Sequence, residues 1–382
     1  MRTTAAAGVV CALALGSALG CSSASVDKNS ADGSAGSNGS AGSPAAAGSG
    51  SGDETGLQLT VGPDSRTFVE LSTPSVLSDV GGTGSESIAW DIALQGHDVF
   101  SNGGISGPGN SSAFGPLSSP TYLSDTAPDV PLMLKDRAGG ALIDWYKYAG
   151  ATHQLFSRYH VYGIQDGERY YKLQILSYYG EQLGAPVSAL YHVRYAEVTA
   201  SGVDVVHDVK DIDATAGGSQ DNDKLPSACL DFDSEQAKPL TPAEAGQSSD
   251  WQLCFRREAI AVNGGLSGPR GMQAVDLQAA DTANETAMDV QARTSASEQK
   301  LFDGVDHAAL TDPALSYAAD GVVTAFGQRW LEPGSDPLAL SDSVWLVIGA
   351  DGASKYLMQF SSLSGDPATG PATLSLQAKS VK

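Results

Sequence analysis

The sequence predicts an all-β protein that contains two tandem antiparallel domains. Three observations support this prediction: apolar and polar residues alternate along short segments, glycine-rich turn formers separate these segments, and one long phrase occurs twice. Alternation with a period of two is typical of strands with one buried and one wet face. A phrase that repeats at so long a period indicates duplicated domains rather than a solenoid.

The repeated phrase begins with a tryptophan and ends in Asn-Gly-Gly-(Ile/Leu)-Ser-Gly-Pro. The spacing from Trp90 to Asn102 in the first copy equals the spacing from Trp251 to Asn263 in the second. The two glycines after each asparagine suggest a backbone demand such as positive φ. This motif is not a phosphate loop, since neither Gly-Lys-Ser/Thr nor a helical pattern follows it.

Two further blocks repeat later in the chain. Trp330 follows Trp145 at the same offset as Asp351 follows Asp166, and each aspartate begins an Asp-Gly hairpin signal. This offset is longer than the one between the two copies of the first phrase, so repeat two carries an insertion between its blocks. The Ala- and Glu-rich segment 279–300 predicts a short helix within this insertion.

The second half of repeat one shows the clearest alternation. The residues predicted to face the core are Tyr171, Leu173, Ile175, Tyr191, Val193 and Tyr195. The residues predicted to face solvent are Lys172, Gln174, His192 and Arg194. These two segments are therefore expected to be strands with one wet face.

The N-terminus predicts an export signal followed by a tether. Residues 1–20 combine Arg2, an apolar stretch and small residues before Cys21, which is the arrangement of a signal peptide. Residues 18–21, Ala-Leu-Gly-Cys, are similar to a bacterial lipobox, so we expect lipidation at Cys21; signal cleavage without lipidation is the alternative. Residues 21–55 are rich in Ser, Gly and Ala and have too little apolar surface to fold. We expect a disordered tether and a lipid anchor in the outer membrane, at the cell surface.

The predicted domains follow the repeats. Domain 1 is expected at 56–202 and domain 2, with the insertion, at 226–382; each is large enough to bury a core. Residues 203–225 between them hold six aspartates, which indicates an acidic linker. A calcium site is not favoured there, because the Asp-x-Asp-x-Asp-Gly loop with its closing glutamate is missing.

Two cysteines remain after the signal and Cys21 are set aside. Cys229 and Cys254 lie in predicted strands near the start of domain 2. In an exported protein such a pair indicates a disulfide, and neighbouring strands permit it. Two free buried thiols are the alternative. A zinc site is not indicated, because the sequence has no Cys-x-x-Cys and no nearby pair of histidines.

The overall charge narrows the classes of function. The formal net charge of −22 argues against nucleic acid as a partner, because nucleic acid is bound through Lys and Arg. It also argues against docking on anionic lipid by charge. Ser-Gly-Pro in the repeated phrase is not the Gly-x-Ser-x-Gly elbow of a hydrolase. We expect a protein that is not an enzyme.

The blocks together resemble the HmuY family in order and spacing. The matching segments are Trp90 to Leu94, Asn102 to Gly107, Trp145 to Tyr148 and Tyr171 to Ile175, and repeat two is similar to a second, diverged copy with Gln252 in place of Asp91. The resemblance implies an exported, usually lipid-anchored, haem-binding protein of Gram-negative bacteria with an all-β, hand-like fold. It also implies haem or haemoproteins as partners, and an outer-membrane haem transporter that receives the haem.

In that family haem is held between loops by two axial side chains, either a His pair or Met. One ligand position follows the Trp145 block and falls here on Gly150, which has no donor, so His153 is the best substitute. The other falls between the two blocks, where Met133 is the only suitable donor. A surface role for His153 and a core role for Met133 are the alternatives. His97 lies where the family has no ligand.

Two functions follow as hypotheses. The first is a surface-anchored haem-binding lipoprotein that captures haem for iron uptake with a site in domain 1, repeat two having lost it. The second is a non-enzymatic surface adhesion or scaffold module that kept the HmuY fold but lost the haem ligands.

Overall fold

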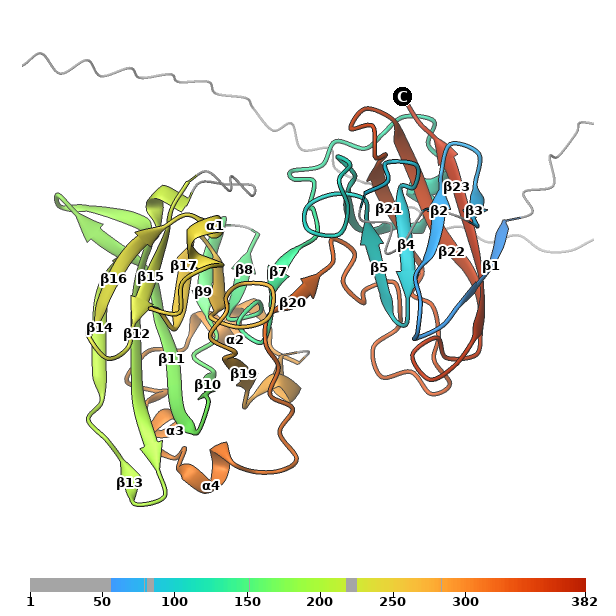
Figure 1. Ribbon diagram of the computed structural model, residues 1–382. Helices are drawn as coiled ribbons and strands as arrows, with labels where there is room; N and C mark the ends of the chain where they lie inside the picture. Colours follow the sequence, from blue (N-terminus) through green and yellow to red (C-terminus); the bar gives the residue numbers. More distant parts are fainter. Residues whose placement is uncertain (1–55, 79, 81–85, 151, 218–224, 283) are drawn as a thin grey trace, which may run out of the picture. The chain divides into compact units, whose positions relative to one another are not determined.

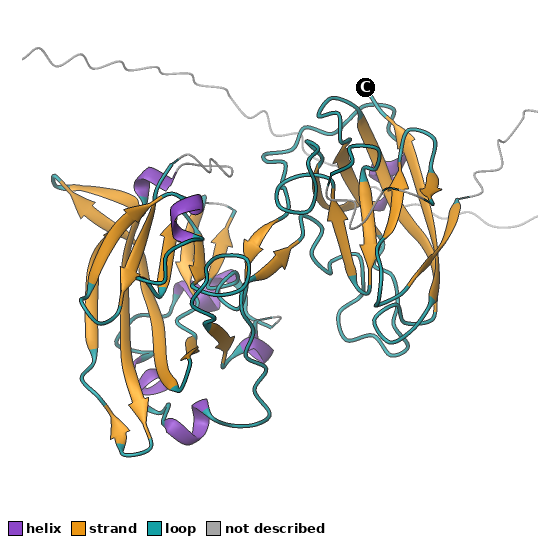
Figure 2. Cartoon of the chain, in the orientation of Figure 1, coloured by secondary structure: helices purple, strands orange, loops and turns teal. Residues whose placement is uncertain are grey.

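The computed structural model describes residues 56–78, 80, 86–150, 152–217, 225–282 and 284–382. Strands dominate these residues, and the helices have at most five residues (Figure 2). The sheets are antiparallel, so the all-β prediction is confirmed. In the described part of the chain, no helix is long and apolar enough to cross a membrane. The predicted signal, Cys21 and the tether lie outside the described residues.

Two sheets form what we call lobe A, residues 56–136 and 324–382 (Figure 1). The larger sheet has the order β1-β23-β22-β21-β6, and the smaller has the order β3-β2-β4-β5. The strands are β1 Leu57–Val61, β2 Thr67–Glu70, β3 Ser75–Leu77, β4 Ile92–Gln95, β5 Asp98–Ser101, β6 Ser112–Ser118, β21 Ser343–Ile348, β22 Lys355–Ser364 and β23 Ala372–Ser380. A 3-10 helix, Ser119–Leu123, follows β6.

Lobe B, residues 140–320, has the same plan. Its larger sheet contains β19, β10, β11 and β12 in that order, with β13 and β14 both on β12, and its smaller sheet has the order β16-β15-β17-β18. The strands are β8 Tyr146–Ala149, β9 Gln154–Ser157, β10 Val161–Asp166, β11 Arg169–Gln182, β12 Ala185–Thr199, β13 Gly202–Val203, β14 His207–Asp213, β15 Ser227–Asp231, β16 Gln236–Leu240, β17 Leu253–Arg256, β18 Ala259–Val262 and β19 Gln273–Asp276. The helices are α1 Pro242–Ala245, α2 Ala287–Gln291, α3 Gln299–Asp303 and α4 His307–Leu310, with 3-10 turns at Thr215–Gly217 and Ala279–Asp281.

Each lobe combines the first half of one repeat with the second half of the other. In lobe A, β1 to β6 of repeat one pair with β21 to β23 of repeat two. In lobe B, β14 to β19 of repeat two pair with β10 to β12 of repeat one. The sheets therefore do not follow the predicted domains, 56–202 and 226–382. The repeats have similar halves, and similarity along the sequence does not say which halves pair.

Hydrogen bonds from the paired tryptophans show the same exchange. Trp330 Nε1 donates to His97 O at 2.9 Å, and Trp145 Nε1 donates to Glu258 O at 2.7 Å. His97 and Glu258 occupy equivalent positions in the two copies of the repeated phrase. Each second-half tryptophan is therefore bonded to the first half of the other repeat.

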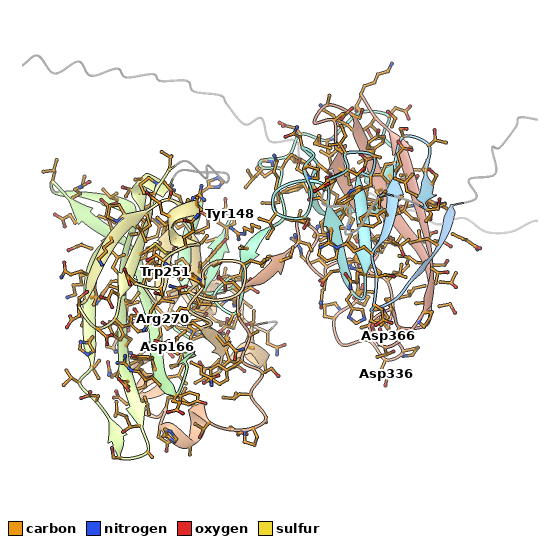
Figure 3. All side chains as sticks on the ribbon, in the orientation of Figure 1. Tyr148, Asp166, Trp251, Arg270, Asp336 and Asp366 are labelled. Carbon is orange, nitrogen blue, oxygen red and sulfur yellow. A yellow bond between two sulfur atoms is a disulfide. The ribbon has the colours of Figure 1, made fainter. Side chains whose placement is uncertain are left out.

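A salt bridge joins the halves within lobe B. Arg270 Nη2 from repeat two lies 2.8 Å from Asp166 Oδ2 of repeat one, and both residues are labelled in Figure 3. Asp166 and Gly167 turn the chain between β10 and β11, as the hairpin signal predicted. The pair is partly buried, which keeps its attraction stronger than that of a fully exposed ion pair.

The chain crosses between the lobes twice. The crossing strands, β7 Arg137–Gly139 and β20 Gly321–Val323, pair with each other, and Ala138 lies opposite Val322. A buried aspartate precedes each crossing: Asp136 before β7 and Asp320 before β20. In the sequence, lobe B is therefore one continuous segment that lies between the two parts of lobe A.

The repeated phrase has a structural role in both copies. Asn102 Nδ2 donates to Trp90 O, and Asn263 Nδ2 donates to Trp251 O, at 2.6 and 2.8 Å. The second glycine of each motif has positive φ, as predicted; at the first, a Cβ would overlap a backbone carbonyl. The backbone geometry requires glycine at both positions after the asparagine, which explains why both copies retain the motif.

Residues 207–213 form an edge strand, although an acidic linker was predicted for 203–225. β14 pairs with β12, and Ile212 enters the core of lobe B while its neighbouring aspartates stay exposed. Charged residues are common on edge strands because they discourage pairing with other chains. Three of the six aspartates that suggested a linker, Asp208, Asp211 and Asp213, therefore belong to a strand edge. Residues 218–224 lie outside the description.

Cys229 on β15 and Cys254 on β17 face each other across neighbouring strands, and a disulfide joins them. They lie in an apolar cluster with Trp251.

Candidate functional site

His153, the first candidate haem ligand, lies in the turn of the β8–β9 hairpin. Its side chain is exposed, and its φ of 55° is uncommon for a residue other than glycine. The Nδ1 atom lies 2.5 Å from the hydroxyl of Tyr148, which is itself half exposed. His153 is therefore held by a surface tyrosine rather than aimed into a buried cleft.

Met133, the second candidate, lies in lobe A. It packs against an apolar cluster that contains Tyr122, Val344, Leu346 and Leu357. A thioether in such surroundings fills the core, as the alternative interpretation of the sequence expected. His153 belongs to lobe B, so the structure does not bring the two candidates together. These two residues do not fit the requirements of a haem site, in which both axial donors face one apolar cleft.

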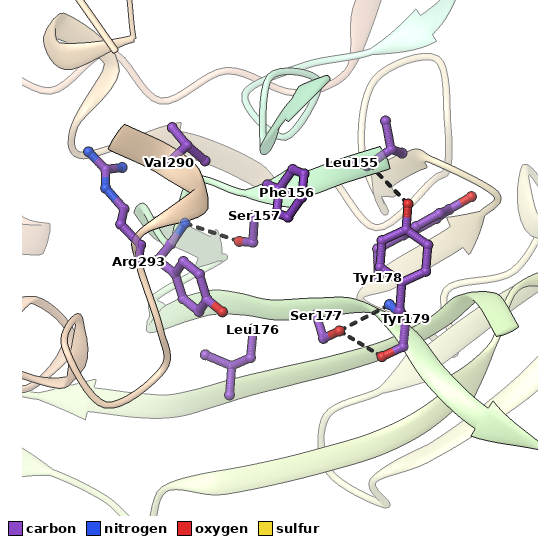
Figure 4. Close-up of a pocket in the computed structure, with 10 residues that line it drawn as sticks. Leu155, Phe156, Ser157, Leu176, Ser177, Tyr178, Tyr179, Val290 and Arg293 are labelled. Atoms are coloured by element: carbon purple, nitrogen blue, oxygen red, sulfur yellow. Dashed lines mark hydrogen bonds between the residues drawn. The ribbon is translucent and has the colours of Figure 1, made fainter. Parts of the chain in front are cut away.

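A small cavity in lobe B lies between β9, β11 and α2 (Figure 4). Its volume is about 90 Å³, and four aromatic rings, two serines and the arginine Arg293 contribute to its walls; the rings are Phe156, Tyr159, Tyr178 and Tyr179. Ligand pockets are usually several times larger, about 300–1,000 Å³. This cavity is too small for a haem macrocycle.

The polar atoms of the cavity wall already have partners. Ser177 Oγ donates to Tyr179 O at 2.7 Å, and the Tyr179 hydroxyl accepts from Leu155 N at 3.0 Å. Ser157 Oγ accepts from Tyr159 N at 3.0 Å. These bonds stabilise a β-bulge in β11 around Ser177, where the register with β12 shifts. The cavity is thus a feature of the bulge.

The insertion of repeat two covers the outer face of the larger sheet of lobe B. We call residues 285–310 the strap; it contains α2, α3 and α4. Phe302, Val305 and Leu310 of the strap pack on Val161, Ala196 and Val198 of the sheet. The short helix predicted within 279–300 is present as α2, and α3 begins at the end of that segment.

Four cations from repeat one are buried beneath the strap or at its edge. They are Arg158, His160, Lys172 and Arg194, each at most 5% exposed. The prediction that Lys172 and Arg194 face solvent is therefore wrong. A buried charge is costly unless it is paired or hydrogen-bonded, and the strap supplies most of the partners.

Lys172 and Arg194 are held by neutral groups. Lys172 Nζ donates to Phe302 O at 2.9 Å and to Val305 O at 3.0 Å. Arg194 donates to the Gln174 side chain on the sheet and to Gln299 on the strap. Both cations also lie over the Phe302 ring, at 4.6 and 4.8 Å from its centroid, an arrangement that cation–π attraction favours. Burial lowers the pKa of Lys172.

His160 is the centre of a buried ionic cluster. Its Nδ1 lies 2.8 Å from Asp276 Oδ2, and its Nε2 lies 3.0 Å from Glu285 Oε1. Glu285 also pairs with Arg158 and Arg293. Burial raises the pKa of Glu285, but His160 and the two arginines outweigh burial and hold the pKa at about 2. Glu285 is therefore ionised at any ordinary pH.

The equivalent face in lobe A has a different chemistry. By register, Leu357 stands where lobe B has Lys172, and Gln377 stands where it has Arg194. The shorter segment that follows β6 covers this face with Tyr122, Val130 and Met133. The cations therefore accompany the longer strap. The sequence pattern did not predict that these cations are buried. A signal was present, because repeat one has Lys172 and Arg194 where repeat two has Leu357 and Gln377.

Three buried aspartates have backbone partners. Asp91 accepts from Leu71 N at 2.8 Å and from Ala350 N at 2.7 Å, so it too joins the two repeats. Asp136 accepts from Ser101 N and Ala325 N, both at 2.9 Å. Burial raises the pKa of Asp91 and Asp136.

Asp320, before the second crossing, accepts from Val262 N at 3.1 Å and from Ser267 Oγ at 2.7 Å. Burial raises the pKa of Asp320 to about 6. In repeat two Gln252 replaces Asp91; its Oε1 accepts from Phe232 N, while its Nε2 is buried and finds no partner among the described residues. Each of these three aspartates therefore accepts hydrogen bonds from backbone groups near the loops and crossings.

Within the described ranges, no group of three or more His, Cys, Asp or Glu residues could hold a metal ion. No model of a known protein family matches the sequence, and no curated protein matches it significantly.

Proposed function

We propose that this protein is a non-enzymatic adhesion or scaffold module of the bacterial surface, which does not hold haem through His153 and Met133. The observation that carries this proposal is the placement of those two residues in different lobes. His153 bonds to a surface tyrosine, and Met133 is partly buried against an apolar cluster. Haem capture remains what the resemblance to the HmuY family implies, but this pair of ligands does not support it.

The packing within lobe B also favours a function that does not involve haem. A cleft between the β8–β9 hairpin and the strap would be the place for a ligand held between loops. In this protein α2 fills that place, since Val290 is buried against β9 and the remaining cavity is about 90 Å³. A macrocycle would enter only after the strap had moved.

The surface location is part of the same proposal. It depends on the export signal of residues 1–20, on lipidation at Cys21 and on the tether of residues 21–55. A tether of that composition would let the folded part stand away from the membrane. The charge of −22 suits a solvated surface module and makes nucleic acid an unsuitable partner.

A haemin titration tests the proposal. Residues 56–382 are titrated with haemin while the Soret band is followed, and His153→Ala and Met133→Ala are titrated in parallel. We expect no saturable shift of the band in any of the three. A saturable shift that either substitution abolishes would restore haem capture with these ligands. A shift that survives both would show that haem binds elsewhere, and it would also contradict the proposal.

A further inference from the structure

His160 is bonded to a carboxylate on each side. Its two ring nitrogens face Asp276 on β19 and Glu285 on the strap, at 2.8 and 3.0 Å. A neutral imidazole has one N–H donor and one acceptor, so it can donate to only one carboxylate. Both bonds form only when His160 carries two ring protons. The geometry therefore joins the strap to the sheet through a protonated histidine.

The surroundings of His160 explain why the charge is accepted in a buried position. Arg158 precedes it on the chain, Arg293 approaches Glu285 from the strap, and the buried Tyr162 hydroxyl lies on β10. Burial alone lowers the pKa of His160, but the hydrogen bonds and charges of Asp276 and Glu285 outweigh it, and the pKa is raised above its ordinary value. Asp276 and Glu285 thus favour the protonated form of His160.

Loss of this proton acts on the strap in a specific way. A neutral His160 keeps one carboxylate and turns a nitrogen lone pair toward the other. If it keeps Asp276, the lone pair faces the ionised Glu285, and the strap loses a charged hydrogen bond at the start of α2. Arg158 and Arg293 still hold Glu285. The expected result is local loosening of α2 and α3 rather than unfolding of the lobe.

We propose that the strap is a pH-sensitive closure of lobe B, which is held closed while a protonated His160 bridges Asp276 and Glu285 and loosens when that proton is lost at higher pH. A raised histidine pKa contributes stability below the ordinary value, and this contribution is lost as the pH rises through the raised pKa. Loosening would uncover the cavity beside Val290 and the cationic face under the strap. An exported protein meets the external pH directly, so such a closure responds to its surroundings.

Hydrogen–deuterium exchange tests the closure in the protein from residue 56 to residue 382. Protection of peptides from the strap, corrected for intrinsic exchange, is compared at about pH 6 and about pH 9, the range over which a raised histidine titrates. We expect protection of the strap to fall at least about tenfold, the change expected for the loss of one hydrogen bond between charged groups. Peptides from β21 to β23 of lobe A are expected to change far less.

Two substitutions separate His160 from general effects of pH. His160→Gln cannot carry the charge, so the strap is expected to exchange rapidly at both pH values. His192→Gln is the matched control, because His192 is partly exposed and pairs with Asp208 on the same sheet rather than with a residue of the strap. It is expected to behave like the parent. Equal protection of the strap at both pH values in the parent, or a pH dependence that survives His160→Gln, would overturn the proposal.

If His160→Gln does not fold, nitrogen NMR of the histidine rings in the unaltered protein decides the matter. The proposal requires two protonated nitrogens on His160 at about pH 6 and the loss of one in step with strap exchange. A ring that holds one proton at low pH, or both throughout, would overturn it.

Discussion

The exchange of halves predicts which pieces of the chain fold alone. Fragment 137–323 contains both crossing strands and every strand of lobe B. Its two ends lie side by side, because Arg137 pairs with Val323. Fragment 56–202, by contrast, contains only β1 to β6 of lobe A and only β8 to β12 of lobe B. We expect 137–323 to fold and 56–202 to remain unfolded.

The core of lobe B gives the magnitude. Fragment 56–202 lacks eight large apolar side chains of that core: Ile212, Leu230, Phe232, Leu253, Phe255, Ile260, Val262 and Met272. Burial of each stabilises by about 1.5–3 kcal/mol, so their loss removes about 12–24 kcal/mol. These values are upper estimates because unfolded chains already bury some surface. They still match or exceed the roughly 5–15 kcal/mol by which a whole domain is stable.

Chemical denaturation followed by tryptophan fluorescence and circular dichroism measures the outcome. Fragment 137–323 is expected to unfold in one cooperative transition, and 56–202 is expected to show none. Mixing 56–202 with 203–382 supplies both halves of both lobes, so a transition is expected to return. Cooperative unfolding of 56–202 by itself would refute the reasoning, because it would mean that a repeat completes its own core.

Two further predictions follow from single sites. Asp320→Asn is expected to flatten the pH dependence of the free energy of unfolding between about pH 4 and pH 6. With a folded pKa of about 6, Asp320 contributes about 3 kcal/mol of stability below its unfolded pKa, and this contribution is lost as the pH rises through the folded pKa. Chemical denaturation at each pH measures the difference. Reduction of the Cys229–Cys254 bond, which closes a loop of 25 residues, is expected to cost about 3 kcal/mol by the same assay; non-reducing mass analysis that finds two free thiols would contradict the bond itself.

Features that depend on neighbouring residues were predictable from the sequence. The alternation around Tyr171 predicted a strand, and Asp166-Gly167 and Asp351-Gly352 predicted hairpin turns that join β10 to β11 and β21 to β22. The acidic segment before residue 226 was misread because composition outweighed the alternation that places Ile212 inside. Local patterns indicate that a strand exists, but a strand edge with many aspartates resembles a linker.

Which halves pair depends on contacts between residues far apart in the sequence, and the local alternation of apolar and polar residues does not predict those contacts. Both second halves carry the same alternation, so either is an acceptable partner for either first half. The distinguishing signals were single residues. Lys172 and Arg194 lie in repeat one, whereas the insertion that buries them lies in repeat two, where Leu357 and Gln377 take their places. Once the register of the strands is known, buried cations in one repeat and the segment that covers them in the other indicate that the two repeats exchange halves.

The exchange also explains why the two candidate haem ligands of repeat one, His153 and Met133, lie in different lobes. The β8–β9 hairpin after Trp145 belongs to lobe B, where it contacts α2 of the strap, whereas Met133 belongs to lobe A. The strap does carry donors, but Met288 is 76% exposed and His307 packs edge-on against Tyr170. Any ligand shared with the β8–β9 hairpin therefore requires the strap to move, which makes haemin titration at about pH 9, where we expect the strap to loosen, the more demanding test of the scaffold proposal.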